Sequence, residues 1–244
     1  MPAIISESEW IATPLGEYVI AREQVLFDAT VADIFGFKAM QLGLPSVDLL
    51  RNCRIPYRIA ASPWGGALRC DFGQLPLATQ SVDLLLLPHV LEFAENPHQI
   101  LRDAERTLVP EGHIVISGFN PVSLWGARHL FCKRSGYPWG GRFISLMRIK
   151  DWLALLGMEV VAGRMACYAP PLKSKNWLAR LDWMDRAGDR WWPMTGGTYF
   201  LVAKKRVAGM RLIRPQWNSR RMAQALIPRP TPTQREFQKK SHEQ

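Results

Sequence analysis

The chain has 244 residues, 48% of them hydrophobic, so it can bury the core of one sizeable α/β domain and is not a globally disordered protein. Its net charge of +10 is unevenly placed: residues 200–244 hold 11 Lys and Arg against 2 Asp and Glu, and the other 199 residues hold 20 against 19. The near-neutral body therefore gives no support for a nucleic-acid-binding domain.

The N-terminal residues and the cysteines predict the compartment of the protein. The first ten residues, MPAIISESEW, lack the basic stretch and apolar run of a secretory signal peptide. Four scattered cysteines without a Cys-x-x-Cys pair suit neither a zinc site nor a disulfide framework, and they fit a reducing cytosol. The most apolar run, residues 82–93, is too short to span a bilayer. The sequence thus predicts a cytoplasmic protein with no metal site and no transmembrane segment.

Before residue 80 the sequence predicts one helix and up to three strands. A Thr-Pro pair precedes a helix over residues 15–35, in which apolar side chains recur near helical spacing. Residues 37–43 form a short apolar run that ends on a glycine, and they predict a buried strand. Residues 56–62 and 66–71 are weaker strand candidates.

Residues 82–88, VDLLLLP, carry the strongest strand signal. A continuous apolar run closed by proline is typical of a central parallel strand that is covered on both faces. Asn96 and Pro97 then supply an N-cap and a first-turn proline for a helix that we expect to stop at residues 110–112. A second buried strand follows over residues 113–119. Strand, helix and strand at this spacing predict a βαβ unit and hence a parallel sheet.

The C-terminal half alternates regular elements with long irregular segments. Residues 146–156 predict an amphipathic helix, and residues 158–165 and 198–206 predict strands. Two Trp-containing segments, residues 120–144 and 170–195, separate these elements and are predicted to act as lids.

Residues 176–192 hold Trp177, Leu181, Met184 and Trp191 along one helical face. Two interpretations stay open for this helix. It is either a lid that contacts a lipid-like acceptor or weakly touches a membrane surface, or a surface helix that packs on the sheet edge. Charges of both signs on its other faces argue against strong binding to an anionic membrane.

The last part of the chain is polar, basic and rich in proline. We predict a single folded domain over residues 1–214 and a flexible tail over residues 215–244. Such a tail either contacts nucleic-acid phosphates without sequence preference or is a solvated, solubilising segment.

The residues from Cys70 to Gly118 follow a specific order of motifs. An aspartate is followed by Leu-Pro, a serine–apolar–aspartate start of a strand, a His-x-Leu-Glu turn, a helix ending in Arg-x-Leu-x-Pro-x-Gly, and a further strand. In this order they resemble the class I S-adenosylmethionine-dependent methyltransferases (methyltransferase type 11-like), the branch that includes quinone- and biotin-pathway methylases. The resemblance implies an α/β fold with a Rossmann-like, seven-stranded, mostly parallel sheet and helices on both faces. It also implies S-adenosyl-L-methionine as cofactor and methyl transfer to a small or lipophilic acceptor.

The resemblance places the cofactor at the carboxyl ends of the central strands, where the strand order reverses. The implied cofactor-binding residues are Gln41, Gly43, Asp71, Phe72, Pro88 and His89. In this interpretation Asp71 accepts a hydrogen bond from the adenine amino group and Phe72 covers the base. The alternative is that Asp71 only opens a turn before Gly73.

The loop after the first predicted strand departs from the family pattern. Gln41, Pro45 and Val47 stand where the family has an acid and two of its glycines. No acid occurs near residues 60–62, where the family binds the ribose, and Asp48 is a candidate substitute.

Two functional hypotheses follow from this departure. In the first, the protein is a divergent methyltransferase that holds the cofactor through Gly43, Asp71 and the turn after residues 82–88. In the second, the site has decayed, and the chain is a catalytically degenerate relative that serves as a ligand- or partner-binding module.

The sequence assigns no catalytic residue, but it offers one candidate. An imidazole titrates near neutral pH, so His89 either orients or deprotonates an acceptor, or it only caps the backbone at the strand end. Glu92 is expected to pair with Arg102 or Arg106. The loop over residues 137–141 is expected to lie near the acceptor.

Overall fold

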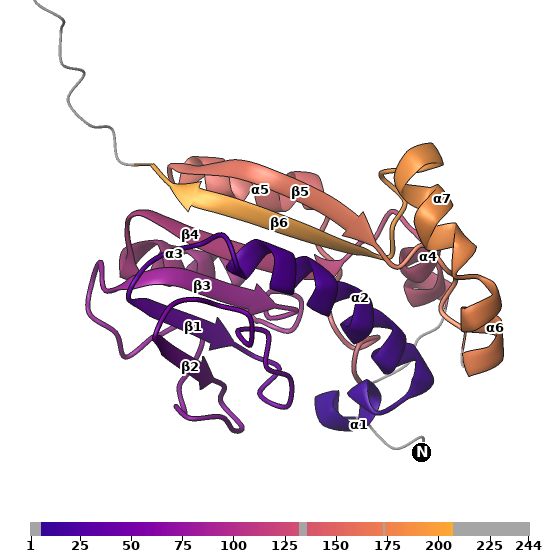
Figure 1. Ribbon diagram of the computed structural model, residues 1–244, viewed down its shortest axis with the longest axis horizontal. Coiled ribbons are helices and arrows are strands. Elements are labelled where there is room, and N and C mark those ends of the chain that lie inside the picture. The colour runs from indigo at the N-terminus through magenta and orange to yellow at the C-terminus, as the bar shows by residue number, and fades with distance from the viewer. Residues whose placement is uncertain (1–5, 132–135, 173, 207–244) are drawn as a thin grey trace, which may run out of the picture. The chain divides into compact units, whose positions relative to one another are not determined.

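The centre of the protein is a six-stranded sheet, shown in Figure 1 in the computed structural model, which describes residues 6–131, 136–172 and 174–206. The strands lie in the order β2-β1-β3-β4-β6-β5. The first four are parallel, and β6 is antiparallel to both β4 and β5, which confirms a Rossmann-like, mostly parallel sheet. The strands are β1 (Lys38–Leu42), β2 (Tyr57–Ala61), β3 (Val82–Pro88), β4 (Leu108–Phe119), β5 (Met158–Ala166) and β6 (Thr198–Lys205). The predicted tail, residues 215–244, lies outside the described residues.

Within the described residues the sheet has one strand fewer than the seven that the resemblance implied. Residues 66–71, a weaker strand candidate, meet the sheet only through an isolated bridge between Ala61 and Leu68. Gly66 has a φ of +94°, and the two N–H groups that follow it both donate to the Ala60 carbonyl. This tight turn folds the segment back onto the end of β2, so the segment does not form a strand of its own.

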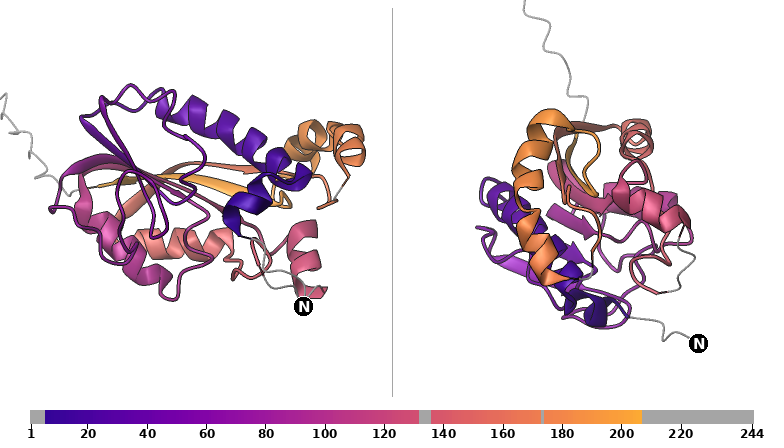
Figure 2. Two further views of the ribbon diagram at one scale, coloured as in Figure 1. Left: turned by 90° about the horizontal axis from the view of Figure 1, so that it is seen from below. Right: turned by 90° about the vertical axis from the view of Figure 1, so that its right-hand side faces the viewer.

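Helices cover both faces of the sheet, as predicted (Figure 2). On one face Leu84 and Leu86 of β3 belong to the core that α2 completes. On the other face Leu85 and Leu87 belong to the core that α3 and α5 complete. All four side chains are fully buried, which explains why this strand is a continuous apolar run. The helices are α1 (Glu7–Ile11), α2 (Pro14–Val31), α3 (Pro97–Thr107), α4 (Leu124–Phe131), α5 (Leu146–Leu155), α6 (Lys175–Arg180) and α7 (Trp183–Trp191).

Two helices begin at the caps that the sequence predicts. The Thr13 side chain accepts a hydrogen bond from the Gly16 N–H at 3.1 Å at the start of α2. The Asn96 side chain accepts one from the Gln99 N–H at 3.3 Å at the start of α3. In both cases proline occupies the first turn, where its missing N–H costs nothing. Helix α3 ends at Thr107, earlier than predicted, because the chain passes directly into β4.

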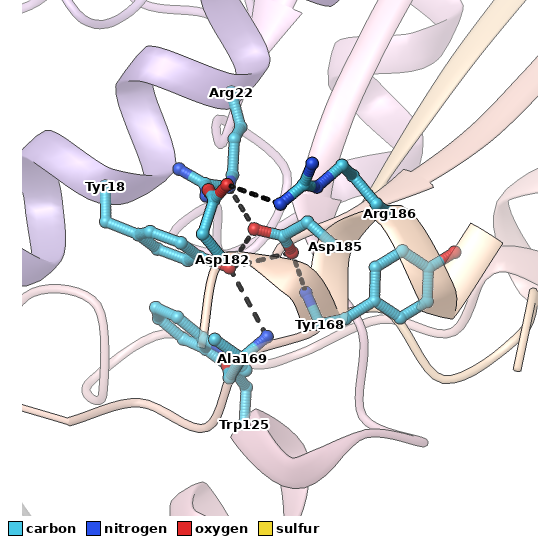
Figure 3. A network of polar contacts seen from close by, with 8 residues as sticks. All are labelled: Tyr18, Arg22, Trp125, Tyr168, Ala169, Asp182, Asp185 and Arg186. Atoms are coloured by element: carbon cyan, nitrogen blue, oxygen red, sulfur yellow. Dashed lines mark hydrogen bonds and ion pairs between the residues drawn. The ribbon is translucent and has the colours of Figure 1, made fainter. Parts of the chain in front are cut away.

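The segment predicted as a single Trp-rich helix forms two helices, α6 and α7, and α7 packs against the edge strand β5. Figure 3 shows the polar network that holds α7 to α2. The Asp185 carboxylate accepts hydrogen bonds from the Tyr18 hydroxyl at 2.8 and 2.9 Å and from the Tyr168 N–H at 2.7 Å. Arg22 of α2 forms ion pairs with Asp185 and, at 2.5 Å, with Asp182. The second helix of this segment therefore packs on the sheet edge, as one of the two interpretations predicts, but Trp177 and Trp191 of the predicted apolar face stay exposed.

We expect Asp185→Ala to lower the free energy of unfolding by about 1–3 kcal/mol, because the largely buried Tyr18 hydroxyl loses its acceptor. Urea unfolding followed by circular dichroism measures the change. Asp182→Ala is the matched control: its side chain is 54% exposed, so its ion pair contributes less than about 1 kcal/mol. Equal losses in the two variants would contradict this description of the network.

Candidate functional site

A cavity of about 900 Å³ opens at the carboxyl ends of β1, β2 and β3. Gly43 follows β1, Ser62 follows β2, and Pro88 and His89 lie at the end of β3; all four line the cavity. The neighbours of β1 in the sheet are β2 on one side and β3 on the other, so the strand order reverses here. Parallel sheets bind ligands at this point, and the volume suits a molecule of cofactor size.

Two segments outside the sheet cover the cavity. Glu7 of α1 and Tyr137, in the loop between α4 and α5, both line it. The Tyr137 ring stacks on Phe93, with 4.7 Å between the ring centroids. The predicted lid over residues 120–144 therefore contributes to the cavity, whereas residues 170–195 contribute nothing to its described lining.

Gly43 leaves the backbone bare beside the cavity. Its φ of +84° is in the left-handed region, which favours glycine. A Cβ placed on this residue would lie 2.9 Å from Val90 Cγ2 and 3.4 Å from the Pro88 carbonyl oxygen. Both neighbours line the cavity, so a side chain at position 43 would displace its wall.

Gln41 is only 1% exposed, and it does not line the cavity. Its side-chain nitrogen lies 2.8–3.1 Å from the carbonyl oxygens of Gly43, Leu44 and Val47. Its side-chain oxygen accepts a hydrogen bond from the Leu49 N–H at 3.0 Å. Gln41, which stands in place of the family acid, therefore fixes the conformation of the loop after β1. It can influence a ligand only by positioning that loop.

Two of the other departures from the family pattern lie at the cavity wall, whereas Val47 packs against the core. Pro45 and Ser62 both line it, and the Ser62 hydroxyl accepts a hydrogen bond from the Trp64 N–H at 3.3 Å. Asp48, the candidate substitute for the ribose acid, does not line the cavity. Its carboxylate accepts the Leu50 N–H at 3.0 Å. The end of β2 thus offers a hydroxyl where the family has a carboxylate.

Asp71 and Phe72 are neighbours in the cavity lining. Asp71 Oδ1 accepts a hydrogen bond from the Gly73 N–H at 2.9 Å, so the turn of the alternative interpretation is present. The carboxylate nevertheless borders the cavity, and one N–H does not exhaust its capacity to accept hydrogen bonds. The turn and an adenine contact are therefore compatible roles for the same side chain.

His89 lies at the centre of a buried cluster of charged groups. Its Nε2 is 3.0 and 3.1 Å from the two carboxylate oxygens of Glu23 on α2, and its Nδ1 is 3.2 Å from Glu92 Oε2. The Ser117 hydroxyl donates to Glu23 at 3.2 Å, and the Phe119 N–H donates to Glu92. The side chains of the histidine and of both glutamates are 1% exposed. The cluster therefore joins α2 to the ends of β3 and β4 out of contact with water.

The two carboxylates keep the His89 ring protonated. Burial alone lowers the pKa of a histidine, but the charges of Glu23 and Glu92 outweigh it and raise the pKa of His89 to about 10. An imidazolium that donates from both nitrogens has no lone pair with which to accept a proton. His89 is therefore not placed to deprotonate an acceptor.

The expectation that Glu92 pairs with Arg102 or Arg106 is wrong. Arg106 instead pairs with Asp103 at 2.7 Å. His89 has a φ of +52°, and the turn that it makes directs both its own ring and the Glu92 side chain into the interior.

Tyr137 belongs to the loop over residues 137–141, which was expected near the acceptor, and it brings a hydroxyl group to the cavity lining. Its hydroxyl is buried and has no hydrogen-bond partner among the described residues. Burial, reinforced by the charge of Glu92, holds the pKa of Tyr137 well above its usual range, so the group is a neutral donor. A buried hydroxyl without a partner costs free energy, and a ligand that accepts its hydrogen bond would remove that cost.

Among the described residues, no group of three or more His, Cys, Asp or Glu side chains is arranged to hold a metal ion. The cysteines described there, Cys53, Cys70 and Cys167, are free thiols. No helix of the described segments is long and apolar enough to cross a membrane.

Comparisons with known proteins agree with this geometry. The model of the methyltransferase domain family matches residues 49–116, which include most of the motif order after Cys70. The uncharacterized protein YafS of Escherichia coli (strain K12) is 35% identical over 163 residues, which cover 65% of this chain and 68% of YafS. A SAM-dependent methyltransferase of Thermotoga maritima has a similar structure, with a TM-score of 0.61 at 14% identity over 82% of this chain and 94% of that one. A SAM-dependent methyltransferase of Archaeoglobus fulgidus gives 0.54 at 14% identity over 82% and 97%.

Proposed function

Because the chain belongs to the family of YafS and is similar to the methyltransferase domain family over residues 49–116, we propose that it binds S-adenosyl-L-methionine in the cavity and methylates a small or lipophilic acceptor. The observation that carries the proposal is the cavity at the strand-order reversal, with bare backbone at Gly43 in its wall. When bound, this cofactor supplies a methyl group on a positively charged sulfur.

Residues of this chain match the parts of the cofactor. Asp71 presents an acceptor for the adenine amino group, and Phe72 presents an apolar ring that covers the base. Ser62 offers a hydroxyl for the ribose, and Gly43 allows close approach of the backbone. Gln41 acts as a positioning residue, because its amide holds the loop and is remote from the ligand.

Pro88 and His89 close the cavity wall at the end of β3. Methyl transfer from a sulfonium depends mainly on positioning, so no residue is required to remove a proton. The Tyr137 hydroxyl, a neutral donor on the covering loop, orients the acceptor in this proposal.

Asp71→Ala tests the placement of adenine. We expect it to weaken binding of S-adenosylhomocysteine about 5- to 150-fold, or ~1–3 kcal/mol, through loss of a hydrogen bond; calorimetric titration measures this. Asp48→Ala is the matched control and keeps the wild-type affinity. Each of the two aspartates accepts a hydrogen bond from the N–H of the second residue after it, at 3.0 Å for Asp48 and 2.9 Å for Asp71. Asp48, however, does not line the cavity. An unchanged affinity in Asp71→Ala would show that adenine is placed wrongly.

A second function is favoured by Pro45 and Ser62. Pro45 has no N–H to offer to a ligand, and Ser62 carries no charge where the family has an acid. These residues support a catalytically degenerate protein that serves as a ligand- or partner-binding module. Such a module would give no heat with S-adenosylmethionine or S-adenosylhomocysteine, whereas the methyltransferase would bind both.

A further inference from the structure

Exposed apolar side chains gather where α4, α6 and α7 lie. Six large side chains there are half or more exposed, and together they form what we call the aromatic patch: Leu130, Phe131, Trp177, Trp183, Trp191 and Trp192. Soluble proteins expose isolated apolar residues routinely, but six large exposed ones on neighbouring helices indicate a surface that binds something other than water.

The two parts of the aromatic patch lie at the same end of the sheet, and the chain segments beside them are joined by hydrogen bonds. The Asn120 side-chain nitrogen donates to the Val122 carbonyl at 3.2 Å and to the Met194 carbonyl at 3.0 Å, so the chain before α4 meets the chain after α7. The Trp125 indole of α4 donates to the Ala169 carbonyl, ahead of α6, at 3.0 Å. Figures 1 and 2 both place α4, α6 and α7 at the same end of the sheet.

On α7 an acidic residue faces α2, and two basic residues lie on another side of the helix. Asp185 faces α2, where it pairs with Arg22 (Figure 3). Arg186 and Arg190 are both exposed, and they lie three and seven residues after Trp183, which places all three on the same side of the helix. The outer side of α7 therefore combines an exposed tryptophan with exposed arginines, although the sequence of the helix contains charges of both signs.

The sequence around α4 is also basic. Residues 112–150, which contain α4, hold six Lys and Arg and no Asp or Glu. On the α7 side, Asp182 is paired with Arg22 at 2.5 Å and with Arg186 at 3.9 Å. Apolar aromatic groups framed by basic side chains are the composition of surfaces that lie on anionic lipid headgroups.

We propose that the aromatic patch binds the surface of an anionic phospholipid membrane, with its tryptophan rings at the headgroup boundary. Lipid is favoured over a second copy of the chain because a symmetric interface would bring the flanking arginines of the two copies together. The proposal is independent of methyl transfer, so it stands or falls separately from the proposed function.

Vesicle co-sedimentation of the full chain tests this proposal. One set of vesicles contains phosphatidylcholine and phosphatidylglycerol in equal amounts, and the other contains phosphatidylcholine alone. We expect binding to the anionic set, accompanied by a blue shift of tryptophan fluorescence. Leu130→Ser/Phe131→Ser and Trp191→Ser/Trp192→Ser are each expected to lower the partition coefficient about tenfold or more.

Phe35→Ser/Leu155→Ser is the matched control and is expected to bind as the wild type does. Both residues are as exposed as those of the aromatic patch, but they lie before β1 and at the end of α5. All variants keep the basic residues after position 206, so a difference between them reports the patch and not the C-terminal segment. Urea unfolding verifies that each variant retains the wild-type fold.

Three results would overturn the proposal. The first is a wild-type protein that binds neither set of vesicles. The second is equal binding by wild type and all variants, which would assign the membrane affinity to the basic C-terminal segment. The third is self-association in the absence of lipid that both patch variants abolish, which would make the patch an interface between copies of the chain.

Discussion

Gln41→Glu is expected to lower the free energy of unfolding by about 3–5 kcal/mol. The substitution replaces a nitrogen that lies 2.8–3.1 Å from three carbonyl oxygens with a carboxylate oxygen. A negative charge then faces acceptors at a position that is 1% exposed, and its hydration is lost without compensation. Urea unfolding near neutral pH measures the difference from wild type.

Gln99→Glu is the control for this substitution. Gln99 lies in the exposed first turn of α3, where an acid is tolerated, so we expect a change within about 0.5 kcal/mol. If Gln41 instead contacted the ligand in place of the family acid, Gln41→Glu would leave stability unchanged and tighten cofactor binding. That result would refute the loop-holding role of Gln41.

His89→Gln is expected to lower the free energy of unfolding by about 3–5 kcal/mol near pH 7. Without the imidazolium, Glu23 and Glu92 remain buried at the ends of a gap with no cation between them. A glutamine donates from one end only and turns its oxygen towards one of the two carboxylates. Urea unfolding measures the loss, and His98→Gln, at an exposed position of α3, is expected to change stability by less than about 1 kcal/mol.

The loss caused by His89→Gln is expected to shrink as the pH rises. Folding raises the pKa of His89 from 6.5 to about 10, so the bound proton stabilises the fold fully below pH 6.5. This contribution is lost as the pH rises towards the folded-state pKa. The wild type therefore loses stability between about pH 7 and about pH 9.5 because His89 releases its proton, and the variant has no proton to release at this position. A difference that stays constant over that interval would show that the ring is neutral in the folded protein.

The central βαβ unit could be predicted because its signals are local. A run such as VDLLLLP identifies a strand buried on both faces, and β3 has this environment. The Asn96 cap and the proline after it set the start of α3. A further local signal, the Ser-x-x-Glu capping box at residues 6–9, marks α1 and could have predicted this helix from the sequence.

The elements that were predicted wrongly depend on contacts between distant segments. Residues 66–71 have a strand-like composition, but the turn at Gly66 binds them back onto the end of β2. The helix predicted over residues 176–192 divides into two, and Asp185 of the second helix binds Tyr18 and Arg22, more than 160 positions earlier in the chain. Periodicity within one segment carries no information about such partners.

The position of the candidate site followed from the order of motifs, but the roles of its residues did not. Gln41 was interpreted as a replacement for a ligand-binding acid, and only the folded loop shows its amide bound to backbone carbonyls. His89 was considered as a base because an imidazole titrates near neutral pH. The sequence could not show that Glu23, 66 positions away on α2, contacts its ring. A charged residue within an amphipathic helix is normally assigned to the solvent side, so the sequence offered no reason to bury it.

Calorimetric titration of the full-length wild-type protein with S-adenosylmethionine and S-adenosylhomocysteine tests the central proposal most directly. We predict heat with both ligands and a dissociation constant below about 100 μM, which corresponds to binding stronger than roughly −5 kcal/mol. No heat with either ligand near 1 mM, a limit of roughly −4 kcal/mol, would contradict a cofactor site in the cavity at the ends of β1, β2 and β3.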